Sequence, residues 1–475
     1  MNDAGPPPEA ASSDPKYDAG SFRDPSSRVW RDGEHIRRGL DATAATDFET
    51  VAASRFFTSA MVDGSIVGTR TVEGASPDGR EWATVLEHDR IPVITYPHEW
   101  SFTMLQDAAL LTLRLVRAAI DEDITTKDAT AYNVQFVGAR PVFIDVPSFE
   151  PYRPGEAWWG YRQFCQMFLF PLMFTAYKDL PHQPWMRGAV DGITPEHARR
   201  VLEGRRAGHK GFLSHVWLHA KADAKFTDSS ADTVDEMKKA GYKKELYVAT
   251  IDRLIALVEG LEWGRSESTW GNYSQRGHYQ SKELLLKADF VRRVAGQSAR
   301  DQVWDIGAND GMFSRIAAEH STTVLAMDAD DLVVDRLYRE LRADGTTGIV
   351  PMYMNFADPS PGIGWNGTER PPLPARSQPD LILALAVIHH LALTHNVPTS
   401  AVLDNFASLD SEVVLEIPTE NDQMVKTLMR HKRAGTHDAY TLAAIESQIA
   451  DRFEVRSREE LPGGSRVIFH LTPRQ

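Results

Sequence analysis

The sequence of 475 residues contains a single cysteine, Cys165, so no disulfide can form within the chain. The lack of a disulfide framework suits a reducing compartment, and we expect a cytoplasmic protein. No Cys-x-x-Cys pair or His/Cys cluster has the ligand spacing of a zinc site, so we expect no metal. The opening residues, Met1 to Pro6, have neither the basic segment nor the apolar stretch of a secretory signal.

Long apolar runs and runs of basic residues are also missing. The most apolar stretch, residues 164–174, is much shorter than the roughly 20 residues of a membrane-spanning helix, and Pro171 interrupts it. It reads as a buried helix pair, or alternatively as an apolar wall for a substrate. The formal net charge of −14 disfavours binding to nucleic acids and anionic membranes. We therefore expect neither as a partner, and the oligomeric state stays open.

The chain is too long for one ordinary core, and its composition changes along its length. Residues 1–27 are rich in Pro, Ala, Ser and Asp, which predicts a disordered tail. Residues 28–157 read as an α+β module, and residues 158–285 as a mainly helical region with a polar loop at 227–233. Strands and helices alternate in residues 286–475, which indicates an α/β domain with a parallel sheet.

Within the α+β module, residues 56–67 and 81–95 read as strands separated by turns. Residues 102–120 carry apolar side chains at helical spacing. Two further strands, at 133–136 and 141–145, are predicted to pair through a tight turn.

The most informative stretch is an apolar strand that ends in Asp305 and leads through a glycine-bearing turn into a helix. Gly307 and Gly311 allow the backbone to approach a ligand closely, and Asn309 tolerates a left-handed conformation. The spacing differs from the G-x-G-x-x-G pattern of dinucleotide sites, and Asp305 would repel a pyrophosphate. A carboxylate there instead suits the ammonium group of S-adenosyl-L-methionine (SAM), so SAM is the expected cofactor.

Three later residues extend this cofactor site. Asp328 ends the next strand, where it can accept hydrogen bonds from both ribose hydroxyls. An isolated aspartate there could equally be a helix N-cap, but its spacing from Asp305, Gly307 and Gly311 favours the cofactor role. Asn355 and Phe356 follow a third strand and are candidates for the adenine edge and ring, although a turn before Pro359 would look much the same.

Candidates for catalysis and acceptor binding lie on either side of these motifs. His389 and His390 follow a buried strand that begins at Asp380, and an imidazole there could act as a general base. Their alternative role is that of packed polar residues lining the loop. Trp270, Tyr273 and Tyr279 precede the first strand of the domain and are either an acceptor-binding aromatic lid or a packed connector. Strands at 453–458 and 465–471 form a closing antiparallel hairpin.

Residues 286–475 resemble class I SAM-dependent methyltransferases. The strings at 128–136, 143–149, 355–365 and 385–391 are similar to the NoeA-like branch of bacterial nodulation-protein methyltransferases. The resemblance covers nearly everything after the tail. It implies a Rossmann-like seven-stranded sheet, methyl transfer and bound SAM, and it leaves the acceptor open.

A second likeness concerns the α+β module. Asp128 and Asn133 have the D-x-x-x-x-N spacing of a kinase catalytic loop, and Asp145 lies where a metal-binding aspartate would fall. A glycine-rich phosphate loop and a Val-Ala-x-Lys strand are both missing. We interpret the module as a kinase-like remnant used for structure or acceptor binding, with active phosphoryl transfer as the alternative.

The sequence thus predicts a SAM-dependent methyltransferase acting on a small-molecule or metabolite-like acceptor, with the N-terminal module assisting acceptor selection. Methylation of a protein or RNA is one alternative. A kinase-like binding scaffold with a vestigial SAM fold is another.

Overall fold

The computed structural model describes residues 15–203, 209–218, 243–265, 280–430, 432–433 and 435–474. The chain divides into two compact units. Unit 1 comprises Met1–Phe136, Pro141–Arg265 and Pro361–Pro371, and unit 2 comprises Val137–Arg140, Ser266–Ser360 and Pro372–Gln475. The expected α+β module and the helical region after it therefore share one unit.

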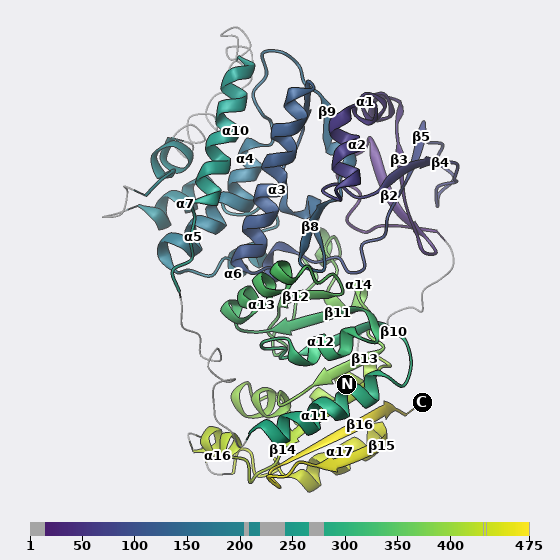
Figure 1. The fold of residues 1–475 in the computed structure, drawn as a ribbon, viewed down its shortest axis with the longest axis vertical. Helices are drawn as coiled ribbons and strands as arrows, with labels where there is room; N and C mark the ends of the chain where they lie inside the picture. Colours follow the sequence, from purple (N-terminus) through teal and green to yellow (C-terminus); the bar gives the residue numbers. More distant parts are fainter. Residues whose placement is uncertain are drawn as a thin grey trace. The chain divides into compact units, whose positions relative to one another are not determined.

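Unit 1 begins with a five-stranded antiparallel sheet in the order β1-β2-β3-β5-β4 (Figure 1). Its strands are β1 (Lys16–Tyr17), β2 (Ser27–Asp32), β3 (His35–Leu40), β4 (Thr69–Val72) and β5 (Thr84–His88). Strand β1 lies inside the expected disordered tail, because Lys16 and Tyr17 pair with Arg31 and Trp30 of β2.

Two helices, α1 (Ala42–Ala52) and α2 (Arg55–Val62), follow β3. The strand predicted at 56–67 is wrong over the span of α2. Ser54 caps this helix by accepting a hydrogen bond from the amide of Phe57, and the helix buries Phe56, Phe57 and Ala60. The second predicted strand, at 81–95, is confirmed only for β5.

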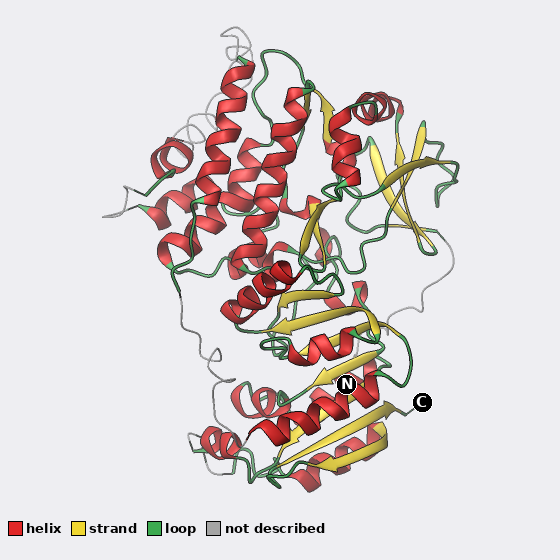
Figure 2. Ribbon diagram, in the orientation of Figure 1, coloured by secondary structure: helices red, strands yellow, loops and turns green. Residues whose placement is uncertain are grey.

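The rest of unit 1 is mainly helical (Figure 2). Helix α3 (Phe102–Asp121) confirms the helix expected from apolar spacing, and the short strands β7 (Val134–Val137) and β8 (Arg140–Phe143) confirm the expected pair. Strands β6 (Ile124–Thr126) and β9 (Phe149–Pro151) form another pair. The further helices are α4 (Tyr161–Phe164), α5 (Phe170–Lys178), α6 (Gln183–Gly188), α7 (Pro195–Leu202) and α10 (Lys244–Glu259).

Unit 2 is built on a seven-stranded sheet in the order β12-β11-β10-β13-β14-β16-β15. The strands are β10 (Arg300–Ile306), β11 (Ser321–Asp328), β12 (Ile349–Tyr353), β13 (Leu381–Ala384), β14 (Glu412–Pro418), β15 (Phe453–Glu460) and β16 (Arg466–Pro473). Strands β10 to β14 are parallel, and the hairpin of β15 and β16 adds two antiparallel strands. The predicted seven-stranded α/β sheet and its closing hairpin are confirmed.

Helices precede and connect the strands of unit 2 and flank the sheet (Figure 1). They are α11 (Gln280–Ala295), α12 (Met312–Ala318), α13 (Asp331–Asp344), α14 (Leu373–Arg376), α15 (Thr399–Ser408), α16 (Gln423–Met429) and α17 (Leu442–Arg452). Every residue of β13 is buried, as expected for a central strand covered on both faces.

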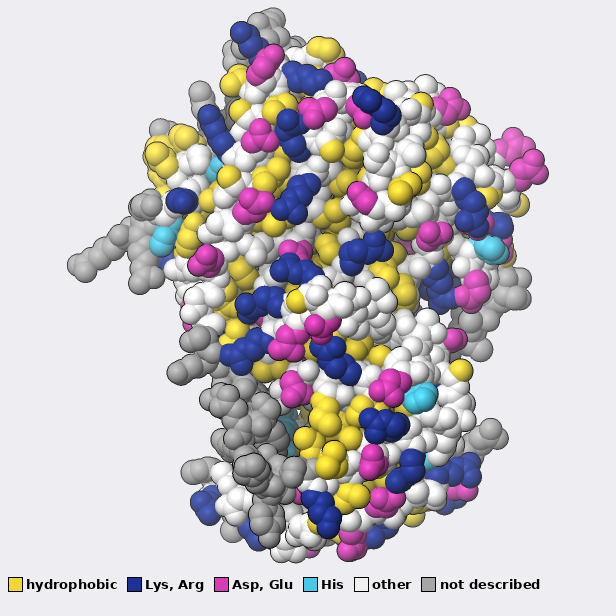
Figure 3. Space-filling model, in the orientation of Figure 1, with side chains coloured by type: hydrophobic (Ala, Val, Ile, Leu, Met, Phe, Trp, Pro, Cys, Tyr) yellow, Lys and Arg dark blue, Asp and Glu magenta, His cyan; other side chains and the backbone are white. Residues whose placement is uncertain are grey.

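The buried apolar stretch at 164–174 belongs to the helices of unit 1, where Cys165 is also buried. Within the described residues, no helix has both the length and the apolar character needed to cross a membrane. On the face drawn in Figure 3, basic and acidic side chains are interspersed.

Candidate cofactor and acceptor site

The sheet of unit 2 reverses its strand order at β10. Strands β11 and β12 continue on one side of β10, and β13 and β14 on the other. Ligands of open α/β sheets bind beyond the carboxyl ends of the strands, at this topological switch point. The loops that follow β10 and β13 therefore define where a cofactor would bind.

The loop after β10 has the backbone conformation that its glycines predict. Gly307, Asn309 and Gly311 have φ angles of 78°, 49° and 74°, all in the left-handed region. A Cβ on Gly307 would lie 2.8 Å from Cγ2 of Val387, in the loop after β13. The two loops at the switch point thus approach so closely that only glycine fits at position 307.

Asp305 is buried at the end of β10 and accepts a 2.5 Å hydrogen bond from the hydroxyl of Ser314 in α12. Burial raises the pKa of Asp305 to about 7, and the charges of Asp328 and Asp310 act in the same direction. The carboxyl group is therefore poised to gain from a cation in the adjoining loop.

Asp328 ends β11 and connects two backbone segments. Its carboxylate accepts hydrogen bonds from the amides of Asn309, at 3.1 Å, and Asp330, at 2.9 Å. Burial raises its pKa. Helix α13 is capped by Asp330, whose side chain accepts from two amides of the first turn. The alternative interpretation of Asp328 as a helix cap is therefore wrong.

The two candidates that follow β12, Asn355 and Phe356, lie in a turn. The side-chain oxygen of Asn355 accepts a 3.0 Å hydrogen bond from the amide of Ala357, and the Phe356 ring lies 5.8 Å from that of Phe406 in α15. Asn355 therefore has the turn role that the sequence left open. Contact of either residue with adenine stays a prediction.

His389 and His390 lie just after β13, with ring centroids 4.0 Å apart. Burial lowers the pKa of His389 to about 2, and His390, Arg466 and Lys287 add to the shift. Burial also lowers the pKa of His390. Both imidazoles are neutral at pH 7, and His389 is too weakly basic to hold a proton there. Nearby Ala386 has a φ of 54°, a strained value for a residue with a Cβ.

The proposed lid residues Trp270, Tyr273 and Tyr279 lie outside the described residues, as does the polar loop predicted at 227–233. Their roles stay predictions.

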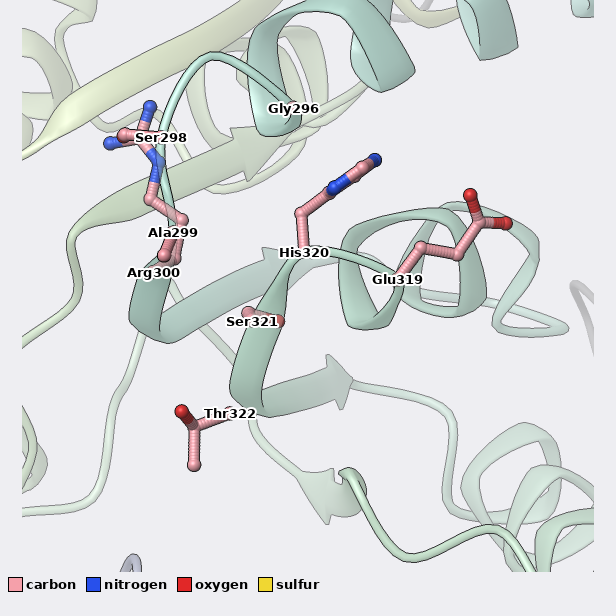
Figure 4. Close-up of a pocket in the computed structure, with 8 residues that line it drawn as sticks. All are labelled: Gly296, Ser298, Ala299, Arg300, Glu319, His320, Ser321 and Thr322. Carbon is pink, nitrogen blue, oxygen red and sulfur yellow. The ribbon is translucent and has the colours of Figure 1, made fainter.

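A pocket of about 500 Å³ opens at the other edge of the sheet (Figure 4). Its lining includes Ser298, Arg300, Ser321 and Thr322, which lie at or just before the amino ends of β10 and β11. Cofactors of open α/β sheets bind at the carboxyl ends, so this pocket does not belong to the site at the switch point.

Unit 1 brings its three kinase-like residues together. The Asn133 amide donates to Asp128 at 2.8 Å, and the Ser148 hydroxyl lies 2.7 Å from Asp128 and 2.5 Å from Asp145. Arg38 forms an ion pair with Asp145 at 2.6 Å. Burial and the charge of Asp145 raise the pKa of Asp128 to about 6. The pKa of Asp145 is lowered, because Arg38 and Ser148 outweigh the effect of its burial.

A curated relative covers almost the whole chain. The nodulation protein NoeA of Rhizobium meliloti (strain 1021) is 31% identical over 468 residues, which is 97% of each chain. The chain belongs to the NoeA family. No family model matches it. The relative's name states a role in nodulation and no reaction, so the chemistry of the family has to be argued from the site.

Solved structures with some likeness include several methyltransferases. The N-methyltransferase NodS from Bradyrhizobium japonicum WM9 has a TM-score of 0.31 and 12% identity, over 42% of this chain and all of NodS. Magnesium protoporphyrin IX methyltransferase from Synechocystis PCC 6803, with bound SAM, has a TM-score of 0.28 and 14% identity, over 45% and 88% of the two chains. Scores this low say nothing about the reaction.

Sequence reasoning did not single out a buried group of ion pairs in unit 2. Glu416, near the end of β14, is fully buried and pairs with Lys287 of α11 and Arg466 of β16. The only signal in the sequence is a glutamate inside an otherwise apolar strand, and its two partners are distant in sequence.

Proposed function

We propose that the chain is a SAM-dependent methyltransferase, with SAM held at the switch point by the loop after β10, Asp305 and Asp328. The main support is the placement of these two carboxyl groups, Asp305 buried and Asp328 half-buried, on either side of the left-handed loop at Gly307. A dinucleotide would bring a pyrophosphate to the same loop, where the two carboxyl groups would repel it.

The residues fit SAM chemically. Burial and the negative charges of Asp328 and Asp310 raise the pKa of Asp305, and the ammonium group of SAM would offset both effects. Asp328 retains lone pairs that can accept the hydroxyl hydrogens of a ribose. Gly307 and Gly311 hold the left-handed backbone of the loop that the ligand would contact.

SAM supplies a methyl group on a positively charged sulfur, so displacement needs an in-line nucleophile more than it needs a catalyst for bond breaking. The chain's task is to orient the acceptor and exclude water. With a pKa of about 2, His389 contributes little as a general base at pH 7. We infer a small-molecule or metabolite-like acceptor. The net charge of −14 counts against RNA, and a protein acceptor remains the alternative.

We further propose that unit 1 helps to select the acceptor and does not transfer phosphate. The favouring observation is the ion pair of Arg38 with Asp145, which neutralises the carboxylate that a kinase would use to hold a metal. Metal-dependent ATP turnover that is lost in Asp145→Ala would overturn this assignment.

Calorimetric titration with SAM and S-adenosylhomocysteine tests the cofactor assignment. We expect micromolar binding of both ligands, and a loss of at least tenfold in Asp328→Ala. Asp344→Ala is the matched control, because Asp344 is exposed at the end of α13. The absence of binding to either ligand by the unmodified protein would refute the methyltransferase function.

A further inference from the structure

A cluster of five charged side chains surrounds the carboxyl end of β14. Oε1 of the buried Glu416 lies 2.6 Å from Nζ of Lys287 and 3.0 Å from Nη1 of Arg466. Arg466 also pairs with Asp422 at 2.8 Å, and Glu283 lies 3.9 Å from both cations. We call these residues the Glu416 cluster.

Two buried polar atoms at this cluster lack partners. Oε2 of Glu416 and Nδ1 of His389 have no hydrogen-bond partner within the described part of the chain. Lys287 and Arg466, which contact Glu416, also act electrostatically on His389, so the two residues lie within the electrostatic range of the same two cations. A buried carboxylate oxygen without a donor costs at least about 1–3 kcal/mol, which a bound N–H or O–H group would recover.

Strand register places the cluster at the edge of the sheet where the cofactor is proposed to bind. Met327, Ile306, Ala384 and Leu415 are paired in one row across β11, β10, β13 and β14. The next residues toward the carboxyl edge include Asp328, Gly307 and Glu416. Two strand spacings of about 4.8 Å separate β10 from β14, so Glu416 lies roughly 10 Å along the edge from Gly307.

The charge of the cluster indicates which kind of group Oε2 of Glu416 would bind. Lys287 and Arg466 contribute two positive charges, and Glu283, Glu416 and Asp422 contribute three negative ones, which leaves a formal charge of −1. A buried excess of negative charge favours a cationic ligand over a neutral or anionic one.

We propose that Oε2 of Glu416 binds the methyl acceptor and that the acceptor group is an aliphatic amine, which enters as its ammonium form. This inference rests on the proposed function and names its substrate class. The ammonium gives one proton to water. Its freed lone pair then forms the N–C bond while the S–C bond of SAM breaks, and the electrons of that bond stay on sulfur. The product is a methylammonium ion, still bound to Glu416.

An amine fits this site better than a hydroxyl. An alkylammonium with a pKa near that of lysine, about 10.4, is a far stronger acid than a hydroxyl group, so its neutral form is reached without a strong base. A hydroxyl group holds its proton far more tightly, since the pKa of water is about 15.7, and it would need an effective general base. His389 has too low a pKa to serve as that base.

The test measures binding of three probes with one ring and different charges: benzylamine, benzyl alcohol and benzoate. Each is titrated by ligand-observed NMR into protein saturated with S-adenosylhomocysteine. Glu416→Gln removes the charge and keeps the shape. Glu412→Gln is the matched control, because Glu412 begins the same strand and pairs with Arg300 at the opposite edge.

We expect the unmodified protein to prefer benzylamine, and Glu416→Gln to weaken benzylamine binding at least tenfold. The affinity for benzyl alcohol should change by less than threefold in Glu416→Gln. In Glu412→Gln the affinities for both probes should be unchanged. If Glu416→Gln keeps its affinity for S-adenosylhomocysteine, it is folded. If this variant does not fold, the order of affinities of the three probes for the unmodified protein is the test. Equal or stronger binding of benzoate would overturn the proposal. If the unmodified protein bound no S-adenosylhomocysteine, the cofactor assignment beneath the proposal would fall instead.

Discussion

Asp305 and Asp328 end adjacent strands, yet their surroundings differ. Asp328 accepts hydrogen bonds from the amides of Asn309 and Asp330, whereas Asp305 is held by the hydroxyl and the amide of Ser314 and has a pKa raised to about 7. A buried acid with a raised pKa binds its proton more tightly in the folded state, so the free energy of unfolding falls as pH rises from about 4 to 7. The buried carboxylate thus lowers the free energy of unfolding at neutral pH, and binding of a cation beside it would raise that free energy again.

We expect Asp305→Asn to have the stability of the unmodified protein near pH 4 and to exceed it by about 4 kcal/mol at pH 8, because the amide carries no charge to bury. Urea unfolding at both pH values measures this. The same variant should bind SAM at least tenfold more weakly by calorimetry. Equal stability curves for the two proteins would mean that Asp305 titrates normally.

Gly307 is the second residue whose replacement tests the proposed cofactor site. In Gly307→Ala the new methyl group would meet Val387 at 2.8 Å and the backbone would keep a φ of 78°. We expect a cost of about 1–3 kcal/mol and a loss of at least tenfold in SAM affinity. Gly345→Ala has a similar φ, 69°, with no atom near the added Cβ, so it measures the backbone strain alone. Equal effects of the two variants on SAM affinity would contradict the close approach of the two loops.

At the scale of elements, α2 shows how tertiary contacts can decide between helix and strand. Its sequence has two adjacent phenylalanines and a β-branched end, which suit a strand. The helix forms because its first amides are all capped. Ser54 accepts from Phe57, and the carboxylate of Glu122, beyond α3, accepts from Arg55 at 3.0 Å and Phe56 at 2.9 Å.

Ser54→Ala should therefore cost about 1 kcal/mol and speed hydrogen exchange of the α2 amides about fivefold. Ser59→Ala lies on the exposed face of the same helix and should leave the exchange rates nearly unchanged. Exchange as slow in Ser54→Ala as in the control would mean that Glu122 alone suffices as the cap.

In the whole molecule, residues that are neighbours in sequence do not always belong to the same compact unit. Residues 361–371 lie between β12 and β13 in sequence, yet they pack within unit 1. There the fully buried carboxylate of Glu369 forms two hydrogen bonds with Arg23, at 2.6 and 2.8 Å. Arg370 lies over the ring of Tyr132, which lies between Asp128 and Asn133 in sequence. Hydrogen bonding from Arg23 lowers the pKa of Glu369.

Glu369→Gln should thus weaken unit 1 although residue 369 is encoded within the second half of the chain. Loss of a charged pair at a buried carboxylate predicts a cost of about 1–3 kcal/mol. Hydrogen exchange read by mass spectrometry should rise in segments 20–30 and 128–136 and stay constant in β10 and β11. Glu340→Gln, on the exposed side of α13, is the control, and a rise confined to β10 and β11 would contradict the prediction.

The sequence by itself determined those features that depend on neighbouring residues. The left-handed turn at Gly307 and Gly311, helix α3 and the closing hairpin all follow from local backbone preferences and apolar periodicity, so they were predicted correctly. The positions of Asp305 and Asp328 at the carboxyl ends of β10 and β11 were also predictable, because each comes at the end of an apolar run.

Only the tertiary structure decided features that depend on residues distant in sequence. The Glu416 cluster joins Lys287, Glu416 and Arg466 from three separate elements, and no local pattern marks their meeting. The weak basicity of His389 likewise comes from burial and from those same cations. Desolvation and charge pairing act through space, so their effects on pKa and on ligand choice are set by packing and cannot be read from spacing along the chain.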